Sequence, residues 1–178
     1  MERKLFVYKS PVGDIYCSFE GEFLIEMSIQ EAIGYRQEAI ELKKTTLSPM
    51  SHSLSPIAYC LFYELDAYFK GDLKEFNQKI KFISGTAFEQ RVWLALKEIP
   101  YGETRSYKWI AEKIACPKAV RAVGQALGKN PLPIILPCHR VIASDGSIGG
   151  FSCGVGIKRW LLRHEGAYGK RGVFIRQA

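Results

Sequence analysis

Residues 106–127 read SYKWIAEKIACPKAVRAVGQAL, and this stretch decides the fold of the C-terminal half. Ser106 can cap a first helix, whose apolar residues then recur at helical spacing. The tripeptide 115–117 is a tight connection to a second helix, predicted over 118–127 and ending near Gly128. Two short helices joined by about three residues, the second rich in small residues, are typical of a helix-turn-helix.

On the N-terminal side of this pair, Thr86 and Glu89 form a capping box, which predicts a helix that ends at Pro100. A last helix is predicted over 156–164. Ser84-Gly85 interrupts the pattern that precedes the capping box. We therefore place a domain boundary here and expect two domains. They cover residues 1–84 and 85–178.

The first 84 residues show strand patterns and then a helix. Three runs of strand-forming residues predict an antiparallel meander, with a further extended piece after the helix. The strands are predicted over 5–8, 15–19 and 23–29, and the extended piece over 76–83. The helix is capped by Ser55-Pro56 and ends at Gly71, and we expect a buried stripe at Tyr59, Phe62, Tyr63, Leu65 and Phe69. Residues 41–55 are predicted to form a loop. The fold class is α+β.

Composition narrows the function classes. The 178 residues are 47% apolar and 24% charged, which excludes a disordered, collagen-like or coiled-coil chain. No apolar run approaches the roughly 20 residues of a membrane span, so we expect a cytoplasmic protein without membrane association. The net charge is +7, and the excess lies beyond Gly85. Such a bias attracts polyanions.

The five cysteines are odd in number and never form a Cys-x-x-Cys pair, so neither a disulfide framework nor a zinc site is expected. Cys138 differs from the others because His139 follows it directly. A working thiol nucleophile needs a base or a positive field, which His139 and Arg140 could supply, and Glu165 could orient the imidazole. From the dipeptide alone, a buried structural cysteine or a cysteine hydrolase remains open.

The string Pro137-Cys138-His139-Arg140-Val141, with 128–131 before it and 149–152 after it, resembles the O6-alkylguanine-DNA alkyltransferases, and the likeness extends from about Thr86 to Gly166. The resemblance implies a small N-terminal α/β domain with an antiparallel sheet of ribonuclease-H-like shape. It also implies a winged-helix-like C-terminal domain that contains the helix-turn-helix.

The resemblance implies DNA repair by an irreversible reaction that happens once per molecule. The thiolate of Cys138 would take the alkyl group from O6-alkylguanine, or from O4-alkylthymine, after the nucleotide is flipped out through the minor groove. The partner would be double-stranded DNA bound by a monomer, and no cofactor would be needed. His139 would take the thiol proton and Glu165 would hold His139. Asn130 would fix the turn before the site, and Tyr107 would donate a hydrogen bond to the flipped guanine.

Further positions follow from the same resemblance. Arg121 would occupy the space of the extruded nucleotide. Other residues would contact DNA or line the guanine pocket. The DNA contacts are Tyr107, Lys108, Lys118, Ala119, Ala122 and Gly124, and the pocket residues are Val141, Phe151 and Ser152.

Phe151 and Cys153 depart from common family residues, and a bulky Cys153 in the pocket rim predicts slower reaction with benzyl than with methyl groups. Two other readings are an alkyl-base-sensing module and the acceptor domain of a transcriptional regulator. The first would lack the acceptor cysteine, which is present here as Cys138. The second would need a regulatory module, which the first 85 residues do not reveal.

Overall fold

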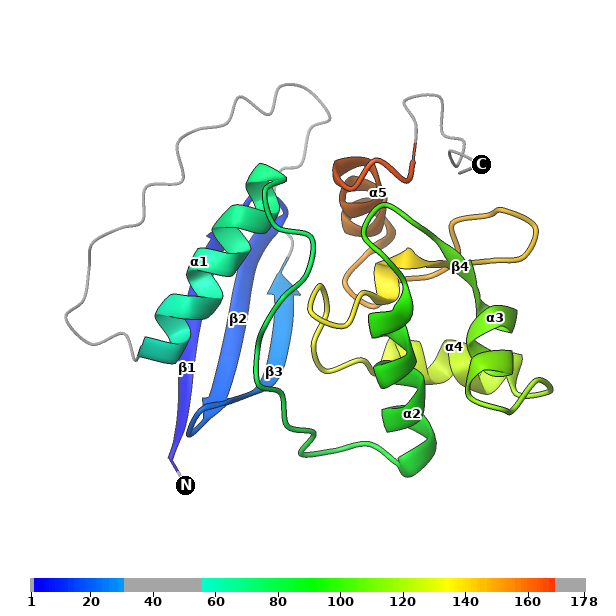
Figure 1. Ribbon diagram of the computed structural model, residues 1–178, viewed down its shortest axis with the longest axis horizontal. Helices are drawn as coiled ribbons and strands as arrows, with labels where there is room; N and C mark the ends of the chain where they lie inside the picture. The colour runs from blue at the N-terminus through cyan, green and yellow to red at the C-terminus, as the bar shows by residue number, and fades with distance from the viewer. Residues whose placement is uncertain (1, 31–55, 169–178) are drawn as a thin grey trace.

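The structure, a computed structural model, describes residues 2–30 and 56–168. An N-terminal sheet with one helix lies beside a C-terminal set of short helices (Figure 1). The coarse prediction of a mixed fold with a small antiparallel sheet is confirmed. The loop predicted over 41–55 lies outside the described residues.

The sheet is a three-stranded meander in the order β1-β2-β3. Its strands are β1 (Arg3–Ser10), β2 (Gly13–Glu20) and β3 (Phe23–Gln30). Strands β1 and β2 are longer than predicted because their pairing continues into the residues at both ends, from Arg3 opposite Glu20 to Ser10 opposite Gly13. Strand β3 is longer by Gln30 alone, which pairs with Asp14. Alternate residues of β2 are buried, as expected for a sheet covered on one face.

Helix α1 (Pro56–Lys70) covers that face (Figure 1). Tyr8 of β1 packs its ring against Phe62 and Phe69, with ring centroids 5.3 and 6.1 Å apart. The predicted aromatic stripe is wrong at two positions, because Tyr59 and Tyr63 are 56% and 69% exposed. They lie one turn apart on the outer face of the helix. Ala58, Leu61 and Tyr68, which were not part of the predicted stripe, lie on the inner face instead. Its buried residues are Ala58, Leu61, Phe62, Leu65, Tyr68 and Phe69.

The extended piece predicted over 76–83 is a single bridge between Ile80 and Leu24 of β3. Leu24 donates its backbone N–H to the Lys79 carbonyl at 2.8 Å and accepts from the Lys81 N–H at 3.1 Å. The chain thus touches the outer edge of β3 once and then passes on to the C-terminal helices.

The C-terminal helices begin where the caps predict. Thr86 Oγ1 accepts from the Glu89 N–H at 3.2 Å, and Ser106 Oγ accepts from the Trp109 N–H at 3.1 Å. The elements are α2 (Ala87–Ala95), the 3-10 turn η1 (Leu96–Glu98), α3 (Tyr107–Lys113), α4 (Val120–Gly128) and α5 (Val155–His164). Helix α4 starts two residues later than predicted, since Ala119 closes a turn with Cys116 and stands outside the helix.

Two short backbone contacts bring distant segments of the chain together around the segment that contains Cys138. Strands β4 (Arg105–Ser106) and β5 (Val141–Ile142) pair in parallel, which sets the start of α3 beside the residues that follow Cys138. The Met27 N–H of β3 donates to the Pro131 carbonyl at 2.7 Å. Buried apolar side chains of both halves form one continuous cluster. The domain boundary at 84/85 stays a prediction.

Candidate functional site

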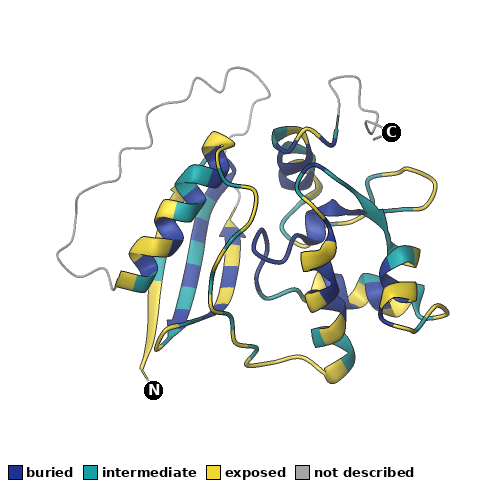
Figure 2. Ribbon diagram, viewed as in Figure 1, coloured by how far each residue is buried: buried dark blue, intermediate teal, exposed yellow. Residues whose placement is uncertain are grey.

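Cys138 is the first residue of the 3-10 turn η2 (Cys138–Arg140) and is only 4% exposed. Every residue from 132 to 140 is buried, so the loop that carries the thiol is packed inside the protein (Figure 2). Ile134 in this loop has a φ of 75°, a left-handed conformation that costs a β-branched residue about 1–3 kcal/mol. Surrounding packing holds the loop in this shape.

Asn130 clamps the loop to the sulfur. Its side-chain amide donates to the Leu136 carbonyl at 2.8 Å and lies 3.0 Å from Cys138 Sγ. Its Oδ1 accepts from the Leu132 N–H at 3.1 Å, which closes a turn at the loop's start. One side chain therefore fixes both ends of the loop and points a donor at the thiol.

Burial raises the pKa of the Cys138 thiol to about 12. The Asn130 hydrogen bond and the charge of Lys158 act in the opposite direction, and neighbouring Cys153 acts in the same direction as burial. The sulfur is therefore protonated at neutral pH, and reaction requires that a base remove the proton.

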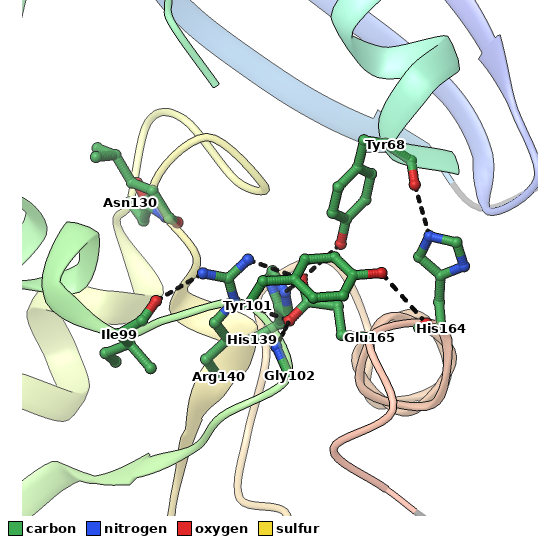
Figure 3. Close-up of polar contacts among 10 residues, drawn as sticks. Tyr68, Ile99, Tyr101, Gly102, Asn130, His139, Arg140, His164 and Glu165 are labelled. Carbon is green, nitrogen blue, oxygen red and sulfur yellow. Dashed lines mark hydrogen bonds and ion pairs between the residues drawn. The ribbon is translucent and has the colours of Figure 1, made fainter. Parts of the chain in front are cut away.

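Glu165, at the end of α5, accepts five hydrogen bonds from the side chains of Tyr68, His139 and Arg140 and the backbone of Gly102 (Figure 3). We call these five residues the Glu165 cluster. His139 Nε2 lies 2.8 Å from Oε1, and Arg140 donates through Nε at 2.8 Å and through a terminal nitrogen at 3.0 Å. The carboxylate is fully buried, so these bonds form away from water.

The protonation states follow from this packing. Burial alone would raise the pKa of the Glu165 carboxyl, but the hydrogen bonds and charges of His139 and Arg140 hold it well below its usual value. Burial lowers the pKa of the His139 imidazole, against the influence of Glu165. A neutral imidazole that donates Nε2–H to a carboxylate presents an unprotonated Nδ1. This Nδ1 is the one buried side-chain polar atom without a partner in the described part of the chain.

A cavity of about 160 Å³ opens onto Cys138. Tyr107 forms one wall, and Gly149 approaches it so closely that an added Cβ would lie 2.8 Å from the Tyr107 hydroxyl. The full lining consists of Tyr107, Gly124, Leu127, Gly128, Cys138, Gly150, Phe151 and Ser152.

Two of the predicted pocket residues, Phe151 and Ser152, therefore lie in this wall. The third, Val141, is fully buried and does not line the cavity, and its carbonyl accepts from Lys158 Nζ at 2.6 Å. Cys153 is half-buried but does not line the cavity within the described residues. The predicted effect of Cys153 on benzyl groups stays a prediction.

The predicted DNA contacts lie on α4, on α3 and in the turn between them. Lys118, Arg121 and Ala122 are exposed, and Ala119 and Gly124 are half-buried. Lys108 is exposed as well and forms an ion pair with Glu112 at 3.7 Å. Because Gly124 also lines the cavity at Cys138, which we call the thiol pocket, α4 connects the exposed surface to this pocket. We call the exposed side of α3, α4 and the turn between them, with Lys108, Lys118, Arg121 and Ala122, the helix-turn-helix face, after the motif predicted from the sequence.

Two residues that hold the site together were not predicted from the sequence. Tyr68 donates to Glu165 across 97 positions of chain, and no local pattern reveals such a contact. Lys158 is fully buried, its ammonium donates to the Val141 and Gly150 carbonyls, and burial lowers its pKa to about 8. A lysine among the apolar residues of α5 was the available signal.

Across residues 2–30 and 56–168, no three histidine, cysteine or acidic side chains gather in a way that could hold a metal ion. The same residues include no helix that is long and apolar enough to cross a bilayer.

Comparison with known proteins gives a consistent result. Residues 87–167 match the family model described as 6-O-methylguanine DNA methyltransferase, DNA binding domain. A methylated-DNA–protein-cysteine methyltransferase of Methanosarcina acetivorans is 54% identical over 104 residues, which are 58% of this chain and 66% of that protein. The alignment thus spans just under two thirds of that relative. The protein of the same description from Mycobacterium tuberculosis is 42% identical over 156 residues, 88% of each chain.

Solved structures extend the likeness to the whole fold. The crystal structure of M. tuberculosis O6-methylguanine methyltransferase has a TM-score of 0.74 at 38% identity and covers 93% of both chains. The structure of the M. tuberculosis protein in complex with DNA has a TM-score of 0.73 at 38% identity, over 90% of this chain and 91% of that one. With a relative 42% identical over 88% of both lengths, this chain belongs to the methylated-DNA–protein-cysteine methyltransferase family.

Proposed function

We propose that this protein repairs DNA by transferring the alkyl group of O6-alkylguanine, and of O4-alkylthymine, irreversibly to its own Cys138. The observation that carries the proposal is a buried thiol at a cavity wall whose neighbouring histidine is held by a buried carboxylate. Family membership supports the same chemistry, as do the names of the relatives.

The transfer is an in-line displacement at the alkyl carbon. His139 Nδ1 takes the Cys138 proton through a water, while Glu165 stabilises the imidazolium that forms. The sulfur then attacks the alkyl carbon, the carbon–oxygen bond breaks, and its electron pair goes to the base, which leaves neutral once the proton taken from Cys138 has been passed on to it. Tyr107 donates a hydrogen bond to the leaving base. The reaction requires no cofactor.

The product explains why each molecule acts once. A thioether is a poor leaving group, and no second nucleophile is proposed to regenerate the thiol. The protein is then consumed by its own reaction.

DNA binding is assigned to the helix-turn-helix face, in a monomer that acts on double-stranded DNA. We propose that α4 enters the minor groove, where readout is largely independent of sequence. Arg121 fills the space of the flipped nucleotide, and Lys108 and Lys118 meet phosphates. On this proposal residues 85–178 form a winged-helix-like domain and residues 1–84 a ribonuclease-H-like one.

The test uses duplex DNA that carries radiolabelled O6-methylguanine. We expect one label per protein, recovered on the peptide that contains Cys138, and none in Cys138→Ala. Binding without label transfer would instead indicate an alkyl-base-sensing module. Turnover of a small ester or amide substrate without any need for DNA would indicate a cysteine hydrolase.

A further inference from the structure

We propose that Tyr68 is a positioning residue for the alkyl transfer, through which the N-terminal half of the protein holds the Glu165 carboxylate and sets how strongly His139 binds a proton. The inference rests on the proposed function, because it concerns the same His139–Glu165 pair. Tyr68 touches neither the thiol pocket nor the helix-turn-helix face in the contacts described above.

The Tyr68 hydroxyl is hydrogen-bonded to the same carboxylate oxygen as His139. Tyr68 OH donates to Glu165 Oε1 at 2.7 Å, and the same Oε1 accepts from His139 Nε2 at 2.8 Å (Figure 3). Tyr68 and the Glu165 side chain are both fully buried, so water cannot replace the hydroxyl without a rearrangement. A change at the phenol therefore reaches His139 through a single shared atom.

Tyr68 is itself held rigidly. Its backbone carbonyl lies 2.7 Å from His164 Nε2, so adjacent residues of the α5 terminus both bond to it. Its ring meets Phe76 and Tyr101 with centroids 5.3 and 6.0 Å apart. A donor fixed on both sides can hold the carboxylate in one orientation, which an exposed tyrosine could not do.

The hydrogen bond also has an electrostatic role. A donor to Oε1 spreads the negative charge of Glu165 and so weakens its pull on the imidazolium. Without the hydroxyl, Oε1 stabilises a protonated His139 more strongly, so the imidazole becomes more basic. The carboxylate that orients the imidazole is then itself held by one hydrogen bond fewer. The titratable or charged groups that act on this pair are Arg140 on η2, Lys158 on α5 and Tyr101 before β4, and His164 on α5 packs against the Tyr68 ring. Tyr68→Phe leaves all of them in place.

The test compares Tyr68→Phe with Tyr8→Phe. Tyr8 is also buried in the N-terminal half and donates to a carboxylate, Asp66 Oδ1, at 2.5 Å. Each variant thus loses one phenol–carboxylate hydrogen bond and keeps its ring. Single-turnover rates on an O6-methylguanine duplex are measured from pH 5 to 9, together with melting temperatures.

For Tyr68→Phe we expect the plateau of the pH–rate profile to fall roughly 3- to 10-fold, which is the scale of one hydrogen bond. The acid limb of the same profile should move upward by about half a pH unit, because His139 becomes more basic. Tyr8→Phe should keep the wild-type plateau and acid limb. The chain has three histidines, so ¹⁵N-histidine NMR can follow His139 directly, and its pKa should rise in Tyr68→Phe alone.

Equal acid limbs and equal His139 titrations in wild type and Tyr68→Phe would overturn the inference, as would the same loss in both variants. Those results leave label transfer by the wild type intact, so they do not touch the proposed function. Conversely, a wild-type protein that transfers no label refutes the proposed function whatever Tyr68 does, and the NMR titration still reports on the hydrogen bond.

Discussion

The Glu165 cluster and the helix-turn-helix face solve opposite physical problems. In the cluster one buried carboxylate accepts five hydrogen bonds, and its partners Tyr68 and His139 are fully buried. On the face, Lys118 and Arg121 are exposed, and the Lys108–Glu112 pair is loose at 3.7 Å. Buried charges depend strongly on each partner, whereas exposed charges act almost independently. Removal of one charge should therefore lower the free energy of unfolding strongly in the cluster and only slightly on the face.

The largest effect is expected for Glu165→Gln. The variant leaves the Arg140 guanidinium buried without its counter-charge, which should cost about 3–5 kcal/mol of unfolding free energy. Urea denaturation at pH 7 measures the loss. The matched control is Glu112→Gln, which removes an exposed carboxylate from the Lys108 pair and should change stability by less than about 1 kcal/mol.

The same comparison has a defined pH dependence. Because the pKa of Glu165 is depressed in the folded protein, its stabilising contribution is complete above the unfolded value of about 4.3 and is lost as the pH falls through the folded value. The difference in unfolding free energy between wild type and Glu165→Gln should therefore become smaller in strong acid. A gap that is absent at pH 7, or that widens in acid, would contradict the buried ion pair.

The two regions also differ in how far sequence predicts them. The capping residues Thr86 and Ser106 start their helices as expected, since a cap is a local feature. The neighbours Cys138 and His139 are visible as a dipeptide, and Glu165 is a candidate partner for the imidazole from sequence, to which the family resemblance adds support. The role of Tyr68 is not predicted from the sequence, because the spacing of aromatic residues on α1 does not indicate which ring lies beside a carboxylate 97 residues away.

Burial of α1 shows the same limit. Tyr59 and Tyr63 carry the same apolar signal as Phe62 and Phe69, yet they are exposed. Which face of a helix is buried depends on the surface that it packs against. Here that surface includes the ring of Tyr8 on β1, which comes from a segment far away in the chain. Periodicity alone leaves the choice open when aromatic residues occupy both faces.

An intermediate effect is expected for Arg121→Ala. The exposed arginine on α4 is proposed to stand in for the extruded nucleotide, and flipping a paired base costs a few kcal/mol, so repair in duplex DNA should slow by roughly ten-fold or more. Reaction with the free base O6-methylguanine, which needs no flipping, should be unchanged. Arg91→Ala, an exposed arginine on α2, serves as the control. Equal slowing on duplex and free base would assign Arg121 to the pocket instead of the helix-turn-helix face.

The smallest effect is expected for Lys118→Gln, and it tests whether the face acts additively. Lys118 is exposed in the turn before α4, where a phosphate contact would be purely electrostatic. Loss of one such contact lowers the slope of log K against log salt by about 0.9 and weakens binding equally on every sequence. Fluorescence anisotropy with an undamaged duplex at several salt concentrations measures the slope. Lys74→Gln removes an exposed charge from the segment after α1 and should leave the slope unchanged.

If Lys118→Gln alters affinity on one sequence only, or if both lysine substitutions change the slope alike, the face is not the local phosphate-binding surface proposed above. In that case its exposed cations contribute to binding only through the overall charge of the protein.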